Sequence, residues 1–507
     1  MHSPFHAGAP VFRVVPIAGL LRERPTAVFW AATAAQAMLW LLVPSLFYAS
    51  PPGDLPEVLA IGHQWQLGSW LGPPLAFWLA EIAFAAAGGH VIGVYALAQA
   101  CVVGTFWAIY RLGRAVVGPP HATIAILLMT GVFALSVPTP EFGPNVLGMP
   151  LAALSLLLYW RAVGEGRRAY WLPLGFALGL MLFATYWAAL LIALFAVFTF
   201  ATARGRATLA TIDPWAAAAI ALLVPLPHWA WLNRGGLALL PQATPSVLLS
   251  PAIVAAIAAS HLGLVALLVL AHAKGARRGD AIEIERPPTA PFARTLVLFF
   301  ALAPLLAATA AAAILGHVSP SWAALLVLMS GLAVVVAAPD PLRLERPQIL
   351  AAAWTAVLLL PAFVMLAAIL LLPWVGISTI PGQEPAASMG RFFSDTFQRR
   401  VGRSLERVGG DLHVASLIAL ASPSRPGVYD AAAPARTPWT NEADMRQRGA
   451  ILVWPIADSV GAPPTALRAR FPELVAEVPQ TFERPVQGWL PSIRIGWAVI
   501  RPQAAAR

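Results

Sequence analysis

The fold is decided by long apolar segments that end in arginine, such as residues 90–114, HVIGVYALAQACVVGTFWAIYRLGR. Residues 90–110 hold no Asp, Glu, Lys or Arg, and they are long enough to cross about 30 Å of hydrocarbon as a helix. Similar segments recur along the 507 residues, which are 59% hydrophobic and only 11% charged. A soluble domain needs far less apolar surface, so the composition predicts a polytopic membrane protein.

Eleven segments are apolar and long enough to be membrane spans, although some are short and closely joined. They lie at about 26–50, 90–110, 121–138, 143–161, 170–185, 187–203, 214–232, 248–273, 293–316, 320–338 and 349–375.

Lysine and arginine are distributed unevenly among the gaps between these segments. The N-terminus and every second gap after it hold seventeen of them, and the opposite set of gaps holds only Arg234. Because basic loops stay in the cytoplasm, the first set is predicted to be cytoplasmic and the second extracytoplasmic. We therefore expect a multi-pass protein of a bacterial cytoplasmic (inner) membrane, with residues 1–25 inside and residues 377–507 outside. No cleavable signal is expected at the N-terminus.

Residues 73–88, PPLAFWLAEIAFAAAG, are apolar but short, and counting them as a span would invert every later gap. They are predicted to form a helix in the outer membrane interface, with Trp78 at headgroup depth. Pro73 and Pro74 suit the first turn of such a helix. The first outer loop is then long, at about 51–89.

Two acidic sites fall on the predicted outer face. Asp54, Glu57 and Glu81 belong to the first outer loop, and Glu141 ends the third segment. Carboxylates from two places in the chain could converge on one pocket and act as a general base or hold a divalent metal. The alternative is that they are solvated. For Glu57 a solvated loop position is preferred. Glu81 is expected to face headgroup water, with a position lining the pocket as the alternative.

Short motifs follow one another in a particular order. Asp54 is followed nineteen residues later by Pro73-Pro74-Leu75-Ala76-Phe77-Trp78. The later motifs are Tyr110-Arg111-Leu112-Gly113-Arg114, Thr139-Pro140-Glu141, Ala184-Thr185-Tyr186 and Pro227-His228-Trp229-Ala230-Trp231-Leu232-Asn233. In this order and spacing, residues 25–240 resemble glycosyltransferase family 39, the group of protein O-mannosyltransferases and of the aminoarabinose transferase of lipid A. The membrane fold of that family is called GT-C.

The resemblance implies an all-α membrane domain of GT-C type over residues 26–376 and an inverting glycosyltransferase. Such enzymes pass a sugar from a polyprenyl-phosphate carrier to an acceptor hydroxyl of a lipid, glycan or protein outside the membrane. Asp54 takes the position of the general base and Glu141 that of a supporting acid. If a divalent metal is bound, these two are its candidate ligands, and no other cofactor is implied.

Further residues at matched or neighbouring positions are candidates for substrate binding. They are Glu57, His63, Pro73, Trp78, Tyr186, His228, Asn233 and Arg234. Helix capping is the preferred interpretation of His228 and Asn233, and an interfacial aromatic belt is the preferred interpretation of Tyr186 and Trp78.

The chain also departs from the family pattern. Leu55 follows Asp54 where the family has Glu, Gly72 stands where Lys or His precedes Pro-Pro-Leu, and Thr185 replaces a Lys. Cations that would offset the donor phosphate are therefore missing, and His63 and Arg234 are the substitutes on the outer face. By the same pattern, a lysine at Gly72 is expected to help phosphate binding.

The C-terminal region, 377–507, differs in composition and is predicted to be a small α/β domain. Residues 387–401 form an amphipathic pattern with Met389, Phe392, Phe393 and Phe397 on one side. Strands are expected at 428–429, 450–454 and 493–500, and helices at 410–420, 441–448 and 463–470. Cys101 is the only cysteine, so no disulfide is expected.

Three functions remain open at this point. The first is the glycosyltransferase. The second is a non-catalytic relative that binds a lipid carrier or acts as an envelope scaffold, which the missing cations favour. The third is a lipid-linked sugar transporter, which is disfavoured because the chain shows no internal repeat. The basic residues are dispersed among loops, so the net charge of +10 does not indicate nucleic-acid binding.

Overall fold

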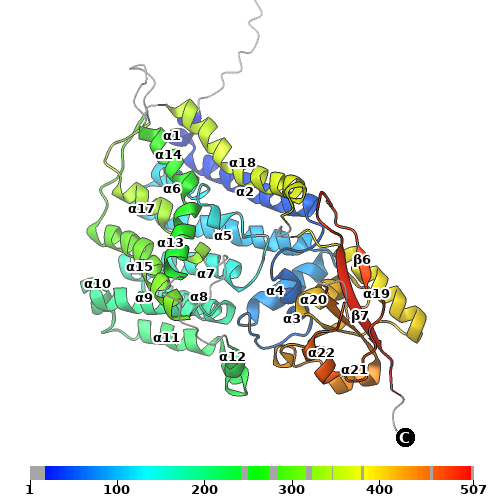
Figure 1. Cartoon of the computed structure of the whole chain (residues 1–507). Coiled ribbons are helices and arrows are strands. Elements are labelled where there is room, and N and C mark those ends of the chain that lie inside the picture. The colour runs from blue at the N-terminus through cyan, green and yellow to red at the C-terminus, as the bar shows by residue number, and fades with distance from the viewer. Residues whose placement is uncertain are drawn as a thin grey trace, which may run out of the picture.

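The computed structural model describes residues 17–240, 249–272, 282–315, 323–344, 346–377, 382–456 and 461–503. A helical part is followed by a small domain built on a sheet (Figure 1). The helices of the first part are α1 (Ile17–Glu23), α2 (Pro25–Phe47), α3 (Leu55–His63), α4 (Leu75–Ala86), α5 (Ile92–Val117), α6 (Pro119–Met129), α7 (Pro144–Tyr159), α8 (Trp171–Ala184), α9 (Ala188–Ala201), α10 (Ala203–Thr208), α11 (Asp213–Leu223), α12 (Leu226–Asn233), α13 (Leu249–Ser260), α14 (Leu262–His272), α15 (Pro291–Leu315), α16 (Ala323–Leu326), α17 (Ser330–Ala337) and α18 (Pro347–Leu371).

Five helices of the described residues are long and apolar enough to cross a membrane: α2, α5, α7 with its continuation to Gly164, α15 and α18. The pairs α11–α12 and α13–α14 are bent by 54° and 52°, and they raise the number to seven if each pair is one span. The other four predicted segments form shorter helices, so the count of eleven spans is not confirmed. Pro225 and Pro227 account for the break before α12, because proline removes amide donors and clashes with the preceding turn.

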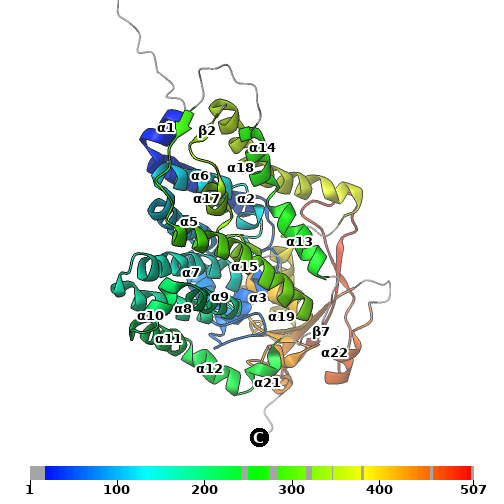
Figure 2. The same cartoon turned by 90° about the vertical axis from the view of Figure 1, so that its left-hand side faces the viewer.

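Local sequence explains where several helices begin and how closely two of them pack. Proline opens α2, α6, α7, α15 and α18, where a missing amide donor costs little. Gly175 and Gly179 of α8 lie against α11, and a Cβ atom on Gly175 would be only 2.4 Å from the Ala217 carbonyl oxygen. Small residues four apart permit this close approach, as they do in other membrane helix pairs. Both views place α11 and α18 at opposite edges of the helical part (Figure 2).

The gaps between helices gather at two ends of the helical part. At one end, β1 (Ile282–Ile284) pairs with β2 (Leu342–Leu344), and Arg204 donates to the carbonyl of Gly164 at 3.0 Å. At the other end, Thr185 donates to Asn145 at 3.1 Å, and Glu141 lies against Gly53. The first end collects gaps that were predicted to be cytoplasmic and the second those predicted to be extracytoplasmic. Which end faces the cytoplasm stays a prediction.

The C-terminal part is a five-stranded sheet in the order β4-β3-β5-β7-β6. β4, β3 and β5 are parallel, and β7 and β6 run antiparallel to their neighbours. Its elements are α19 (Ala386–Val401), β3 (Arg407–Gly410), α20 (Leu412–Ala421), β4 (Gly427–Asp430), α21 (Glu442–Arg448), β5 (Ala450–Pro455), α22 (Thr465–Arg470), β6 (Gln480–Phe482) and β7 (Ile493–Ile500).

Alternation along the central strand gives the sheet two buried faces. Ile451 and Val453 of β5 pack with α19 and α20, whereas Leu452 and Trp454 pack on the other side with α21 and α22. α19 turns Met389, Phe393 and Phe397 into the first of these cores, as its amphipathic pattern predicted.

α3 and α4 lie between the long helices and the sheet domain (Figure 1). α20 packs directly on α3, and Ala60 of α3 contributes to the core beneath the sheet. Leu420 and Trp439 of the sheet domain pack in return against the core of the helical part. The segment that carries Asp54 is therefore covered by the C-terminal domain.

Candidate functional site

Asp54 stands at the N-terminus of α3, and its carboxylate makes no hydrogen bond or ion pair with the described part of the chain. It occupies the N-cap position, where an Asp side chain commonly accepts a hydrogen bond from the helix, yet it makes no cap hydrogen bond here. The residue keeps a solvent-accessible surface, although the surrounding chain partly desolvates its carboxyl group. A carboxylate at a helix start that neither caps nor pairs is available to a substrate.

Glu141 approaches Asp54 from a different part of the chain. A Cβ atom built on Gly53 would lie 2.5 Å from Cδ of Glu141, so the carboxyl group of Glu141 touches the residue next to Asp54. The turn before Glu141 is held by Gln99 of α5, which donates to the Thr139 hydroxyl at 3.2 Å. The structure thus brings the two carboxylates together at the end of the helical part that carries α3.

Electrostatics couple the two carboxylates. Burial first, and then the charge of Glu57, raises the pKa of Asp54, while His413 acts in the opposite direction. Burial and the charge of Asp54 raise the pKa of Glu141. Both groups therefore hold a proton more readily than free carboxyls do, as expected where like charges share a partly desolvated site.

Glu57 is not a solvated loop residue, contrary to the preferred prediction. It is 6% exposed and accepts a hydrogen bond from Nδ1 of His413 at 2.8 Å. Its second oxygen is buried and has no partner among the described residues. The prediction was wrong because residues 55–63 form a helix that α20 covers, rather than an open loop.

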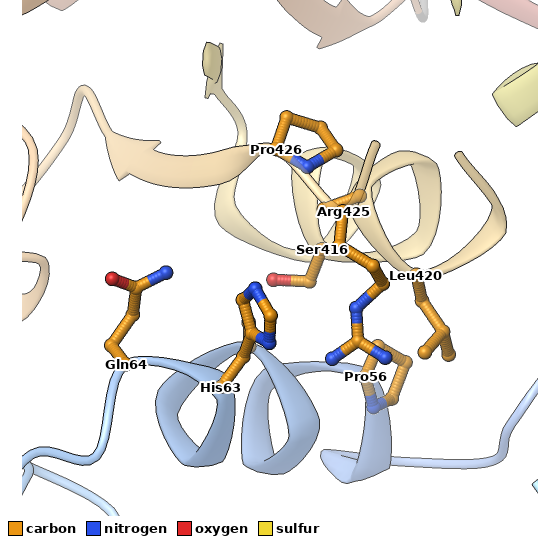
Figure 3. Close-up of a pocket in the computed structure, with 9 residues that line it drawn as sticks. Pro56, His63, Gln64, Ser416, Leu420, Arg425 and Pro426 are labelled. Carbon is orange, nitrogen blue, oxygen red and sulfur yellow. The ribbon is translucent and has the colours of Figure 1, made fainter. Parts of the chain in front are cut away.

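Glu81 does not face headgroup water either. Its carboxylate accepts hydrogen bonds from His63 at 2.9 Å and from Arg425 at 3.0 Å. Burial alone would raise the pKa of Glu81, but these two hydrogen bonds and the charge of Arg425 lower it. His63, proposed as a substitute for a phosphate-binding cation, is thereby engaged at the crevice between α3 and α20, where its ring points toward α20 (Figure 3).

His228 and Tyr186 form a second cluster beside the first loop. Nδ1 of His228 lies 2.9 Å from the carbonyl oxygen of Leu67. His228 therefore holds the first loop, whereas the preferred prediction was that it caps its own helix. Its ring stacks on Trp231 with centroids 5.4 Å apart and lies 5.6 Å from the ring of Tyr186. Nε2 of His228 and the Tyr186 hydroxyl are buried and lack partners among the described residues. Two such orphaned groups can serve a ligand, because buried polar atoms are normally paired.

The remaining candidates divide into anchors of the loop and exposed residues. Trp78 donates through Nε1 to the Gln66 carbonyl at 3.0 Å and packs edge-on against Phe183. Pro73 is buried at the start of α4. Asn233 and Arg234 end α12 and are exposed. The predicted position of α4 in the membrane interface stays a prediction.

The carboxylates of Asp54 and Glu141 were the predicted ligands of a divalent metal. Within the ranges that the structure describes, no three His, Cys, Asp or Glu residues gather closely enough to hold an ion. Asp54 and Glu141 stay the candidate ligands, because a magnesium ion commonly takes one or two carboxylates from the protein and completes its shell with waters and substrate phosphate. We derive no step through a metal.

Several site residues come from the C-terminal domain and had no signal in the sequence. His413 and Arg425 reach Glu57 and Glu81 across more than 340 positions. Arg436 lies over the ring of Trp70, with its Cζ 4.7 Å from the centroid. No local pattern distinguishes these three residues from other surface cations, and only the docking of the domain reveals them.

Comparisons with known proteins agree with this architecture. Residues 72–231 match the family model described as dolichyl-phosphate-mannose-protein mannosyltransferase. The crystal structure of ArnT from Cupriavidus metallidurans in the apo state superposes with a TM-score of 0.58 at 11% identity, covering 94% of this chain and 99% of that chain. The same protein bound to undecaprenyl phosphate gives a TM-score of 0.55 at 11% identity, covering 95% and 98%. A search of curated protein sequences found no match. The chain has the GT-C fold, as its motifs predicted.

Proposed function

We propose that this chain, with its GT-C fold, is an inverting membrane glycosyltransferase. It moves a sugar from a polyprenyl-phosphate carrier to a hydroxyl of an extracytoplasmic lipid, glycan or protein acceptor, in the cytoplasmic membrane of a bacterium. The observation that carries the proposal is the convergence of Asp54 and Glu141 at one end of the helical part. The match to a mannosyltransferase family model over residues 72–231 supports the reaction class.

Asp54 is the general base of the proposed reaction. Its carboxylate accepts the proton of the acceptor hydroxyl while the oxygen attacks the anomeric carbon from the face opposite the phosphate. The bond from the anomeric carbon to the phosphate oxygen breaks, and polyprenyl phosphate leaves with the electron pair, so the anomeric configuration inverts. A base works best when its pKa approaches the operating pH, and the raised pKa of Asp54 moves it in that direction.

Glu141 acts on the base and on the acceptor. Its charge beside Asp54 favours proton uptake in the pair, since two adjacent carboxylates hold a shared proton more readily than one alone. In this proposal its carboxylate also accepts a hydrogen bond from the acceptor. Both roles need the close approach that Gly53 allows.

The donor phosphate is assigned to the side of the site formed by α12 and the first loop. Arg234 is an exposed cation at the end of α12, while Nε2 of His228 and the Tyr186 hydroxyl lack partners among the residues that the structure describes. Gly72 and Thr185 supply no charge, and Thr185 is instead bonded to Asn145. Arg234 therefore takes the phosphate-binding role in this proposal.

The missing cations at Gly72 and Thr185 also support a second candidate, a non-catalytic relative that binds a lipid carrier or scaffolds an envelope complex. Asp54→Asn separates the two candidates because it preserves size and removes the proton acceptor. Asp395→Asn, on the exposed side of α19, is the matched control.

The experiment compares lipid-linked sugars extracted from a deletion strain carrying the wild type, Asp54→Asn or Asp395→Asn at equal protein levels. The transferase proposal expects a polyprenyl-phosphate sugar to accumulate in the deletion strain and with Asp54→Asn, but not with Asp395→Asn. Normal lipid profiles with Asp54→Asn would favour the non-catalytic relative.

A further inference from the structure

The C-terminal domain is joined to the first loop by two ion pairs on adjacent helices. His413 of α20 contacts Glu57 of α3, and Arg425, just after α20, contacts Glu81 of α4. Figure 3 shows Arg425 reaching down from the sheet domain toward α3 and His63 reaching up from it. Arg425 also lies over the ring of Phe84, with its Cζ 4.5 Å from the centroid.

The two pairs differ in where they lie relative to the proposed base, because Glu57 is on α3 and Glu81 is on α4. Glu57 lies three residues after Asp54, about one helical turn, so its carboxylate shares the start of α3 with Asp54. His413 interacts electrostatically with Asp54 itself. Glu81 is held instead by His63 and Arg425. One pair thus adjoins the reactive carboxylate, while the other anchors α4.

His413 is surrounded by acidic groups from every segment around it. Glu57 comes from α3, Glu384 from the segment before α19 at 4.0 Å from Nε2, and Asp411 from the N-cap of α20. Asp54 stands beyond Glu57, with Glu141 against Gly53. The hydrogen bond to Glu57 raises the pKa of His413 to about 9. The ring is therefore an imidazolium at neutral pH.

The backbone around this charge is tied to the end of α2. Ser50 donates to Glu384 at 2.6 Å, and the amides of Ala49 and Ser50 both donate to the Gly382 carbonyl. Gln383 donates to the Phe47 carbonyl at 3.1 Å. These contacts hold Glu384 and the segment that leads into Asp54 in one geometry.

We propose that the C-terminal domain completes the transferase pocket by placing the His413 imidazolium against Glu57 and beside Asp54. This inference rests on the proposed function and makes His413 a positioning residue, since it acts through Glu57 and does not touch the substrate. Its charge offsets Glu57, so that Asp54 can ionise among several other carboxylates. Without that charge, the pKa of Asp54 would rise further, and a smaller fraction of the base would be ionised at a given pH.

The test measures the pH dependence of sugar transfer between pH 5.5 and 8.5 by the full-length protein. It compares the wild type with His413→Gln, His413→Arg and Arg425→Gln. His413→Gln should shift the acidic limb of the profile to higher pH, with a several-fold greater loss of rate at pH 6 than at pH 8.5. His413→Arg keeps a cation and should restore most of the wild-type profile.

Arg425→Gln is the control for domain docking, because it breaks the second ion pair without touching the charge beside Asp54. It should lower the rate uniformly and leave the position of the acidic limb unchanged. If His413→Gln also gave only a uniform loss, the proposed role of His413 would be wrong while the transferase stood. If Asp54→Asn retained the wild-type rate in the same assay, the proposed function itself would fail.

Discussion

Gly53 makes the approach of the two central carboxylates possible. Its backbone has φ of +54°, a conformation that other residues adopt only at a cost, and its missing side chain leaves room for Glu141. The residue before the proposed base is therefore constrained twice, by conformation and by space. The motifs around Asp54 and Glu141 mark both carboxylates as candidates, whereas no pattern in the sequence marks Gly53.

Gly53→Ala should both strain the turn and displace Glu141. The expected loss of stability is about 1–3 kcal/mol from the backbone conformation, with a further loss of activity because Glu141 must move. Thermal unfolding in detergent and the transfer rate would measure the two effects. Gly166→Ala is the matched control, since Gly166 has φ of +69° and nothing within 4 Å of its Cβ position. Equal activity losses in both variants would contradict the steric part of the argument.

Gly72→Lys is predicted to harm the protein, whereas the family pattern alone suggested a benefit. A Cβ atom at Gly72 would lie 2.8 Å from Cγ of Pro144, a rigid ring at the start of α7. Forcing a side chain into packed space typically costs about 1–3 kcal/mol. A lower thermal midpoint than that of the wild type is therefore expected, and an unchanged midpoint with faster transfer would show that the original expectation was right.

At the scale of elements, α3 is the helix on which the site depends. It carries Asp54 at its start, Glu57 one turn later and His63 at its end, and it is packed between α4 and α20. A Cβ atom on Gly62 would lie 2.3 Å from the Phe77 carbonyl oxygen, so α3 and α4 are in backbone contact. Movement of α20 would therefore reach Asp54 through a single short helix.

The His413–Glu57 pair should make stability depend on pH. The pKa of His413 is raised from 6.5 to about 9 in the folded chain, so the stabilisation is fully present below pH 6.5 and is lost as pH rises through about 9. Thermal unfolding of the wild type should show a falling midpoint across this window. His413→Gln should remove most of that dependence, and an unchanged pH dependence in this variant would contradict the assignment.

Local patterns predicted many elements and missed those that lack a pattern. The strands at 428–429, 450–454 and 493–500 fall within β4, β5 and β7. β3 was missed because it reads Arg-Val-Gly-Gly, and two glycines in four residues do not indicate a strand. Hydropathy predicts full membrane spans at about 121–138 and 187–203, whereas the helices there, α6 and α9, have 11 and 14 residues.

At the scale of the whole molecule, the sequence predicts that the segments between helices gather alternately at two opposite ends of the helical part. It does not predict the docking of the C-terminal domain. Alternation of basic and neutral gaps depends on counting charges along the chain, and the contacts at the two ends agree with it. The pairing of His413 with Glu57 depends on tertiary packing between segments about 350 residues apart. No local pattern in the sequence indicates such a contact. For that reason the predictions that Glu57 is solvated and that Glu81 faces headgroup water were both wrong.

Membrane orientation follows from the same arrangement. Reporter fusions after residues 165 and 205 should report the cytoplasm, because these gaps carry arginine and contact each other through Arg204. A fusion after residue 400, in the domain that covers Asp54, should report the opposite side. A cytoplasmic signal at residue 400 would place the proposed site on the wrong face for an extracytoplasmic acceptor.

The central claim is that Asp54 is the base of a sugar transfer from a lipid phosphate. Its most direct test is the release of polyprenyl phosphate by the purified full-length protein in liposomes, supplied with a panel of polyprenyl-phosphate hexoses and a cell-envelope acceptor extract. The wild type should release the carrier only when acceptor is present, and Asp54→Asn should be slower by about 10²–10⁴-fold at unchanged thermal stability. Release by Asp54→Asn at the wild-type rate would contradict the account.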